Sequence, residues 1–347
     1  MRKLIRLAIA AGAVMATFAF TGSALAAYQP RLIVTSLTNG ANKPTTMLLE
    51  HLQTASDDAT AKDTIYAPLG YQANLTQAPG TNLGTVDATL ILRDGGNATA
   101  DASGPVVVDS PANWGPQATQ CTGTATHEAV WRLDITVAGT PLRVPIFVDH
   151  AAGPEAAFSS VKIQFCLTGP IGTPAGAQLL DAFFDVQGVF TSPPNTQTRV
   201  WRAVMTPYVA GSPNPNPAGT IESQAVVPGK VSFAIKSTPI KKKKGWVTIS
   251  GKVTADGKAQ GRASLQIYRV PNLNKPIVSV KTKANGTFSV KKKFKRRTVL
   301  FAVVVKVADL GAPPCPAPQL PGVPGGCVTA TSSFGAAAFF TAKPRKR

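Results

Sequence analysis

The sequence predicts an all-β protein built from two or three antiparallel β-sandwich domains with little helix. Short segments in which apolar and polar residues alternate recur along the chain and are separated by turn residues. Glycine and proline are plentiful, at 30 and 29 residues, while aromatic residues make up only 7% of the chain. Hydrophobic residues account for 44%, which is enough for substantial cores. This mixture is typical of many short strands joined by turns.

The first 26 residues are predicted to be a secretory signal peptide. Three basic residues precede an apolar run, Leu7–Phe20, and the small-x-small cleavage site Ala24-Leu25-Ala26 follows. The run is too short for a transmembrane helix, which needs about 20 apolar residues. We therefore expect a secreted, extracellular protein, associated with the cell surface if charge or a partner holds it there, and with no transmembrane segment after cleavage.

Residues 27–226 are predicted to form an acidic β-sandwich-like domain of unknown function. The expected strands are Arg31–Ser36, Thr45–Gln53, Val86–Leu92, Val106–Asp109, Glu128–Val137, Leu142–Asp149, Ser160–Leu167, Ala182–Thr191 and Arg199–Tyr208. A tight hairpin is expected around residues 138–140, and a second hairpin at Ser192–Thr196. The segment Leu179–Val186 fits either a turn or two of helix or a strand. A simple sandwich has about 100 residues, so this region is either one elaborated sandwich or two small ones.

A proline-rich stretch at residues 211–219 predicts a domain boundary near residue 226, where the charge changes sign. Residues 27–227 carry 9 Lys and Arg against 15 Asp and Glu, a net charge of −6. Residues 228–347 carry 24 Lys and Arg against two acidic residues, Asp256 and Asp309, a net charge of +22. Residues 227–347 are therefore expected to be a strongly basic sandwich domain with a basic C-terminal tail.

The strands expected in this second domain are Trp246–Thr254, Ala263–Val270, Ile277–Lys283, Thr287–Phe294 and Val299–Ala308. The stretches WVTISGKVTADGKAQGRASLQIYRV and KTKANGTFSV contain an I-x-G-x-V opening and an N-G-x-F step. In these features residues 245–308 resemble bacterial carboxypeptidase-regulatory-like domains, which are transthyretin- or immunoglobulin-like sandwiches. The resemblance implies a spacer, a stalk or a binding module.

The first region resembles uncharacterised secreted actinobacterial proteins. The stretches that carry this resemblance are DDATAKDTIYAPLGY, CTGTATHEAVW and VWRAVMTPY. The resemblance implies no activity and no functional residues.

Four cysteines fit an oxidising compartment. They allow three connectivities, and pairing within each region favours Cys121 with Cys166 and Cys315 with Cys327. Such bridges would contribute about 4 and about 3 kcal/mol to stability respectively. Because no C-x-x-C motif or close Cys/His pair is present, we expect disulfides, with no metal or other cofactor.

The histidines give weak indications of catalysis. His127-Glu128 begins like the zinc motif H-E-x-x-H, but Trp131 occupies the position of the second ligand. Asp149-His150 ends a strand, where catalytic residues often lie.

Other polar residues are further candidates for a site. His51 is expected at the surface. Paired carboxylates that suit glycoside hydrolysis are available in Glu128, Asp134, Asp149, Asp181 and Asp185, with solvated surface charge as the default for each. The loop Asp94–Asn97 with Asp101 is expected to be an ordinary turn and not a calcium site. No catalytic residue is assigned.

The lysine-rich segments have the clearest physical consequence. The candidate polyanion-binding residues are Lys241, Lys242, Lys243, Lys244, Lys291, Lys293, Lys295, Arg296 and Arg297. Lysines two apart on a strand are about 7 Å apart, comparable with the charge spacing of an anionic polymer. The sequence therefore favours a secreted structural or binding protein held to an anionic cell-envelope polymer or membrane surface, with nucleic acid only an incidental partner. The alternatives are a solvated basic surface without a partner, a secreted hydrolase that the basic domain localises, and an adhesin for a polysaccharide or protein.

Overall fold

The computed structural model describes residues 28–345 except 39, 138, 170–175 and 312–314. The predicted signal peptide and the last two residues of the basic tail lie outside the described residues. The described chain is almost entirely β-structure, with one short α-helix, α2 (Gly115–Thr122), and three single 3₁₀ turns at Pro111–Asn113, Gly153–Ala157 and Pro217–Gly219. The prediction of an all-β, mainly antiparallel fold is confirmed.

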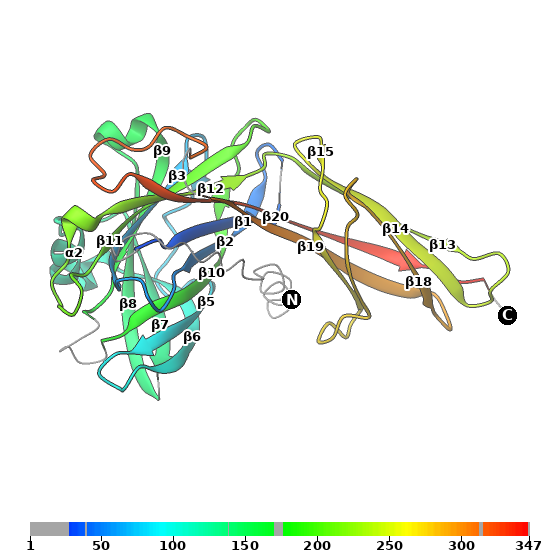
Figure 1. Ribbon diagram of the computed structural model, residues 1–347, viewed down its shortest axis with the longest axis horizontal. Coiled ribbons are helices and arrows are strands. Elements are labelled where there is room, and N and C mark those ends of the chain that lie inside the picture. The colour runs from blue at the N-terminus through cyan, green and yellow to red at the C-terminus, as the bar shows by residue number, and fades with distance from the viewer. Residues whose placement is uncertain (1–27, 39, 138, 170–175, 312–314, 346–347) are drawn as a thin grey trace, which may run out of the picture.

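The described residues of the first region form twelve strands (Figure 1). They are β1 (Arg31–Ser36), β2 (Pro44–Leu52), β3 (Thr60–Pro68), β4 (Gln72–Ala73), β5 (Asn82–Leu92), β6 (Ala98–Asp109), β7 (Ala129–Val137), β8 (Thr140–His150), β9 (Ser159–Cys166), β10 (Gln178–Thr191), β11 (Arg199–Pro207) and β12 (Ile221–Val227).

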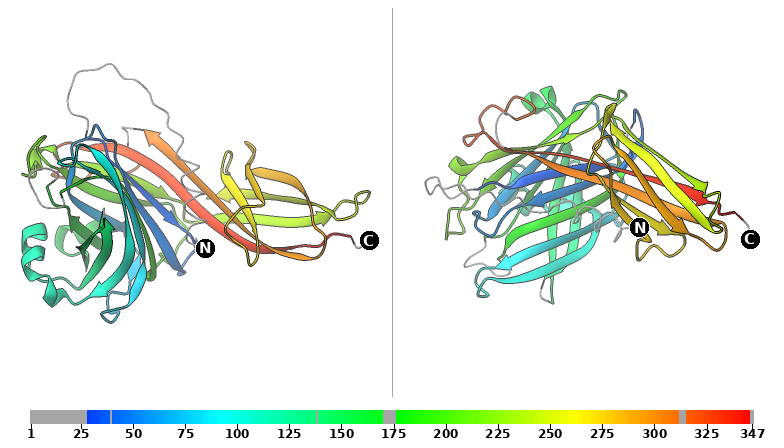
Figure 2. Two further views of the ribbon diagram at one scale, coloured as in Figure 1. Left: turned by 90° about the horizontal axis from the view of Figure 1, so that it is seen from below. Right: turned by 45° about the vertical axis from the view of Figure 1, so that its right-hand side comes forward.

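Eight strands form the second region, an elongated arm that ends in a tip beside the C-terminus (Figure 2). They are β13 (Val231–Pro239), β14 (Trp246–Ala255), β15 (Lys258–Ala259), β16 (Ser264–Arg269), β17 (Val278–Lys281), β18 (Thr287–Lys293), β19 (Thr298–Gly311) and β20 (Cys327–Ala342).

One sheet runs through both regions, in the order β1-β2-β10-β5-β6-β7-β8-β9-β3-β11-β12-β20-β19-β16-β17, with β4 beside β10. The arm is completed by a second sheet of β13, β14, β15 and β18. A shared core, with Ile249 and Phe288 from the second sheet and Ile267, Leu300 and Val304 from the first, lies between the two layers of the arm. The arm is therefore a sandwich, and one of its layers continues the sheet of the first region.

The sheet of the first region curls, so that its first strand, β1, lies beside β12 and β20. Side chains of β12 and β20 form hydrogen bonds with the backbone groups on the free edge of β1. The amide of Leu32 donates to Ser223 Oγ at 2.9 Å. Thr329 Oγ1 donates to the carbonyl of Pro30 at 2.8 Å, and Thr331 Oγ1 donates to that of Leu32 at 2.6 Å. An unpaired strand edge promotes aggregation, and these hydroxyl groups cover this one.

The curled sheet encloses a large apolar core, because apolar and polar side chains alternate along its strands and the apolar ones face inward. In β7 the residues Trp131, Leu133, Ile135 and Val137 are buried in that core, as the sequence pattern predicts. The residues between them point outward. β7 pairs with β8 from Ala129–Val148 to Val137–Thr140, so the predicted tight hairpin is confirmed.

The structure corrects several sequence-based expectations. The segment Leu179–Val186 belongs to strand β10 and contains no helical turn. Ser192–Thr196 is not the turn of a hairpin, because β10 pairs with β2, β4 and β5 whereas β11 pairs with β3 and β12. Helix α2 and the strands β3, β12, β13 and β20 were not expected. The predicted boundary near residue 226 falls at the end of β12 (Ile221–Val227), and its status as a domain division stays a prediction.

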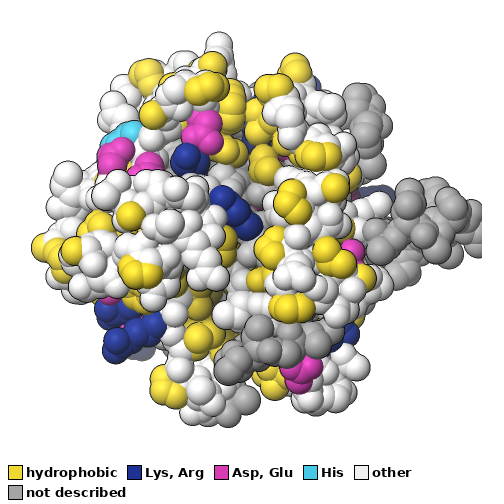
Figure 3. All heavy atoms as spheres, turned by 90° about the vertical axis from the view of Figure 1, so that its left-hand side faces the viewer, with side chains coloured by type: hydrophobic (Ala, Val, Ile, Leu, Met, Phe, Trp, Pro, Cys, Tyr) yellow, Lys and Arg dark blue, Asp and Glu magenta, His cyan; other side chains and the backbone are white. Residues whose placement is uncertain are grey.

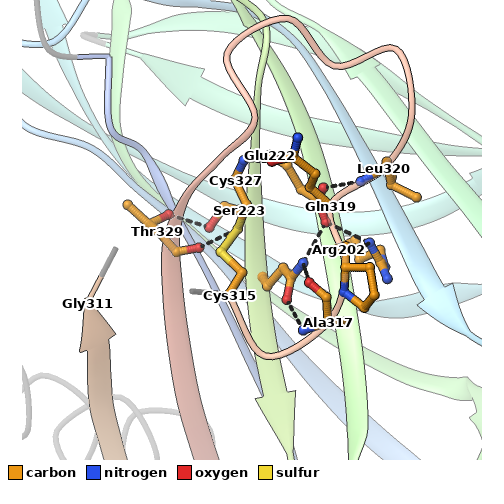
Figure 4. The surroundings of a disulfide bond; sticks show 12 residues. Arg202, Glu222, Ser223, Gly311, Cys315, Ala317, Gln319, Leu320, Cys327 and Thr329 are labelled. Carbon is orange, nitrogen blue, oxygen red and sulfur yellow. Dashed lines mark hydrogen bonds and ion pairs between the residues drawn. A yellow bond between two sulfur atoms is a disulfide. The ribbon is translucent and has the colours of Figure 1, made fainter. Parts of the chain in front are cut away.

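Both predicted disulfides, Cys121–Cys166 and Cys315–Cys327, are present. The first joins α2 to the end of β9. The second closes a loop before β20 that folds back over β11 and β12 (Figure 4).

A buried carboxylate holds that loop in place. Glu222 is fully buried and accepts bonds from the Arg202 guanidinium at 2.9 Å and from the Leu320 amide at 2.7 Å. Gln224 exchanges two hydrogen bonds with the backbone of Ala317, both at 2.9 Å. The loop thus supplies partners for two buried polar residues of β12, Glu222 and Gln224.

Candidate polyanion-binding surface

Three basic segments meet at the far end of the arm, which we call the basic tip. It comprises the nine predicted residues together with Lys343 and Arg345. Strand register brings the segments together: Trp246 pairs with Lys293, and the amide of Phe294 donates to the carbonyl of Gly245 at 2.8 Å. The pairing of Thr298 with Ala342 places the end of β20 beside the β18–β19 connection. Figure 1 shows these connections and the C-terminus at the same end of the molecule.

The cations of the basic tip are all exposed. No acidic residue accompanies them, since the second region has only Asp256 and Asp309, and both lie at its junction with the first region. Asp256 accepts bonds from Thr198 Oγ1 at 2.6 Å and from the Lys230 amide at 2.9 Å. Asp309 forms an ion pair with Arg31 at 3.0 Å. The positive field of the tip is therefore not neutralised by the protein itself.

The local fold of β18 explains why its lysines face solvent. Phe288 and Phe294 are buried in the arm's core, so the intervening Lys291 and Lys293 point to the opposite, open face. Lys292 lies on the core side but reaches its rim, where Nζ donates to the carbonyl of Ile277 at 2.9 Å. The predicted alternation of the strand is confirmed.

One aromatic side chain accompanies these cations. Trp246 is half-buried at the start of β14, opposite Lys293, and the Lys243 ammonium lies 5.9 Å from the centre of its ring. Such a contact is a cation–π interaction. Trp131 and Trp201 are buried in the curled sheet, so Trp246 is well placed to report on events at the tip.

Two histidines and two carboxylates come together at the other end of the molecule, where β7 begins and β8 ends. His127 Nδ1 bonds Asp149 at 2.7 Å, and His150 Nδ1 bonds Glu128 at 2.6 Å. The backbone amide of Glu128 donates to Asp149 at 2.9 Å, and that of His150 donates to Glu128 at 2.9 Å. Figure 3 shows this end of the molecule, with acidic side chains beside a histidine near its upper edge.

The geometry around His127 suits a structural lock. Its Nε2 bonds the hydroxyl of Thr122 at 2.9 Å, its ring packs 4.7 Å from that of Phe147, and its side chain is only 2% exposed. The Thr122 hydroxyl also reaches the carbonyl of Ala118 at 2.9 Å, within helix α2. Both ring nitrogens are thus engaged and shielded from solvent, which ties α2 to the sheet and leaves no face of the ring for a substrate.

His51 was expected at the surface, and this prediction is wrong. It lies inside the curled sheet, 1% exposed, with Nδ1 3.0 Å from Asp63 and Nε2 3.2 Å from Gln53. Thr60 and Tyr28 complete this buried polar cluster, their hydroxyl groups 2.8 Å apart. The pattern Glu50-His51 in a strand gives no indication of which side chain faces inward.

The predicted carboxylates divide between surface and interior. Glu128 and Asp134 are partly exposed, as expected, but Asp185 is buried on β10 and accepts from the Gln187 amide group at 2.9 Å. Among the described residues, no group of three or more His, Cys, Asp or Glu is arranged to hold a metal ion. Asp94–Asn97 forms a turn, in which the Asn97 amide donates to the carbonyl of Leu92 at 3.0 Å.

Glu50 has a shifted pKa that the sequence does not predict. It is 9% exposed on β2, directly opposite Phe183 of β10. Burial and, secondarily, the charge of Asp181 raise the pKa of Glu50 to about 8. Phe183 packs against Tyr268 and Phe301 of the arm, so Glu50 lies beside the contact between the two regions.

No protein-family model and no curated protein matches the chain. Within the described residues, no helix is long and apolar enough to cross a membrane. The two disulfides are compatible with an extracellular location.

Proposed function

We propose that this protein is a secreted, non-enzymatic component of the cell envelope, held to anionic surface polymers by its basic tip. The observation that carries the proposal is the convergence of three lysine- and arginine-rich segments on one exposed end with no acidic residue among them. A surface of this kind attracts polyanions over about 10 Å at 0.1 M salt.

The architecture supports a tethering role. β19 and β20 run from the first region toward the tip (Figure 1), and β20 alone has 16 residues, a length of roughly 50 Å at about 3.3 Å per residue. Because one end of β20 pairs with β12 and its length pairs with β19, the arm is part of the same sheet as the body. A body bound through this tip would be held away from the surface, free to meet other molecules.

The decisive experiment compares two four-lysine variants on cell-wall fragments. In the tip variant Lys241–Lys244 become Gln. In the matched control Lys230, Lys252, Lys258 and Lys283, exposed at the junction end of the arm, become Gln. Both variants lose the same net charge, so a general charge effect would weaken them equally.

We expect the tip variant to bind at least tenfold more weakly at 50 mM salt and to elute at lower salt, with the control close to wild type. Because binding releases counterions, the affinity falls steeply as the salt concentration rises. Each ionic contact that is lost makes this dependence of affinity on salt less steep. Retention should vanish on fragments stripped of their phosphodiester polymer. Equal behaviour of the two variants, or retention that salt does not change, would exclude the tip as the anchor.

Trp246 provides an independent readout. Adding solubilised wall polymer to the wild type should change the fluorescence of Trp246, and Trp246→Phe should abolish the change while retaining most of the affinity. DNA is expected to bind with a similar salt dependence but without preference over the wall polymer. A strong preference for DNA would contradict an envelope role.

A further inference from the structure

The outer face of the arm carries an apolar patch close to the basic tip. Of the large hydrophobic side chains described, Phe339 of β20 is the most exposed, at 62%, and Val299 of β19 is 47% exposed. Phe339 pairs with Phe301, and Val299 pairs with Thr341, so the two exposed side chains are diagonal neighbours on one face of the sheet. Such neighbours are about 7–8 Å apart, within reach of an aromatic ring. We call Val299 and Phe339 the outer patch.

The alternation of the two strands explains why these side chains face away from the arm's core. Leu300, which follows Val299, is fully buried in the core between the two layers of the arm, and Phe340 packs against the same core. The ring of Phe339 lies 4.7 Å from that of Phe301, which is only 4% exposed. Phe339 is therefore held in place by a buried neighbour while most of its surface remains in water.

Cations follow this patch directly in the direction of the tip. Arg297 and Lys343 flank the last pair of β19 and β20, Thr298 with Ala342, and both are exposed. The one acidic residue in the two strands, Asp309, lies at the opposite end of β19, at the junction with the first region. The same end of the arm thus presents apolar and positively charged groups side by side.

This combination selects the kind of partner. A second copy of the chain is disfavoured, because two regions that each carry a net charge of +22 would repel each other. Two exposed side chains are also too few for a stable protein interface, which buries about 1,200–2,000 Å². A membrane surface requires less. A few apolar side chains at the boundary between head groups and acyl chains suffice when Lys and Arg beside them contact anionic head groups.

We infer that the outer patch is a docking surface for an anionic lipid membrane, in which Phe339 and Val299 enter the interfacial layer while Arg297 and Lys343 contact lipid phosphates. The inference rests on the proposed function, because the basic tip supplies the long-range attraction. It adds a lipid contact that a soluble polymer cannot make. A polymer offers phosphodiester groups to the cations but no apolar layer to Phe339, so a change of Phe339 alone separates the two kinds of binding.

The test measures flotation of the full-length secreted protein with vesicles of phosphatidylcholine, with and without phosphatidylglycerol. We expect binding to the anionic vesicles only. Phe339→Ser should lower the partition coefficient about tenfold, as expected when one aromatic side chain is no longer buried. Leu69→Ser is the matched control, because Leu69 is 51% exposed in the first region, and it should bind as the wild type does.

Fluorescence tests the insertion directly. Phe339→Trp is made in the Trp246→Phe background, so that every other tryptophan lies in the first region. On anionic vesicles the emission of the introduced tryptophan should shift to shorter wavelength, and lipids with a nitroxide on the acyl chain should quench it. Val209→Trp in the same background is the control, at a position 44% exposed in the first region, and should show neither change.

Three results would each overturn the inference: no binding of the wild type to anionic vesicles, equal binding by Phe339→Ser and Leu69→Ser, or no quenching of the tryptophan introduced at position 339. Should Phe339→Ser fold poorly, the quenching experiment decides the matter. Binding to wall polymer separates this inference from the proposed function. Phe339→Ser should bind the polymer as the wild type does, and a wild type that binds polymer but not vesicles would refute the lipid contact alone.

Discussion

The curled sheet and the basic tip use charge in opposite ways. In the first region several cations are matched with carboxylates: Arg132 lies 2.7 Å from Asp109 and 2.8 Å from Asp134, and Arg202 lies 2.9 Å from the buried Glu222. Among the described residues of the basic tip there is no Asp or Glu, because both acidic residues of the second region lie at its junction with the first. The difference indicates that charges in the first region hold the structure together, whereas those of the tip face solvent.

Removing one member of the buried pair should have the largest effect on stability. In Arg202→Met the Glu222 carboxylate stays fully buried without its ion-pair partner, and such a loss costs about 3–5 kcal/mol. Urea unfolding measures it. Arg143→Met is the control. Arg143 is exposed, and its ion pair with Asp134 is longer, at 3.5 Å, so its loss should change stability by less than about 0.5 kcal/mol. Equal losses in the two variants would contradict a structural role for the buried pair.

The two disulfides should differ in their contribution. Replacing Cys121 and Cys166 by serine opens a link across 45 residues, and replacing Cys315 and Cys327 opens one across 12. Loop-closure entropy predicts losses of about 4 and about 3 kcal/mol.

Thermal and urea unfolding of the two double variants test this order. The second variant also tests the loop that covers Glu222, because that loop keeps its hydrogen bonds to β12 without the bridge. A much larger loss of stability on removing Cys315–Cys327 would show that this disulfide, and not the hydrogen bonds to β12, positions the loop.

Glu50 should make stability depend on pH. The fold raises its pKa from 4.5 to about 8, so the folded state favours the protonated form. The stabilisation is complete below the ordinary carboxyl pKa and is lost as the pH rises through 8, with a slope of at most about 1.4 kcal/mol per pH unit. Glu50→Gln mimics the protonated form, so its stability relative to the wild type should increase from pH 5 to pH 9. Urea unfolding at both values measures the difference.

Asp101→Asn, at an exposed carboxylate, controls for charge removal and should show no such trend. A constant difference between Glu50→Gln and the wild type across this range would mean that Glu50 is already ionised at pH 5 in the folded protein.

The alternation of side chains explains what could be predicted from the sequence. It located most strands of the first region, the hairpin after Val137 and the outward lysines of β18, because in each case one face of a strand is apolar. It missed β12, because two of its polar residues, Glu222 and Gln224, are buried under a loop formed by the distant residues 315–327. It also missed β20, which is rich in Ala, Ser and Thr and owes its structure to pairing with β12 and β19.

The same limit applies to the functional surfaces. The lysines were visible as runs in the sequence, but their convergence depends on the register of β14 with β18 and of β19 with β20. His51 and Glu50 are adjacent in one strand, and each is buried on a different side.

The smallest expected effect on stability is at the tip, and it sharpens the comparison between the two regions. Lys241–Lys244→Gln removes four like charges that face solvent, so stability should change by less than about 0.5 kcal/mol or increase slightly at low salt as repulsion is relieved. Because salt screens such repulsion, any gain at 20 mM salt should disappear at 500 mM. Urea unfolding at the two salt concentrations measures this. A loss comparable with that of Arg202→Met would show that these lysines support the fold, and their exposure would then no longer argue for a partner.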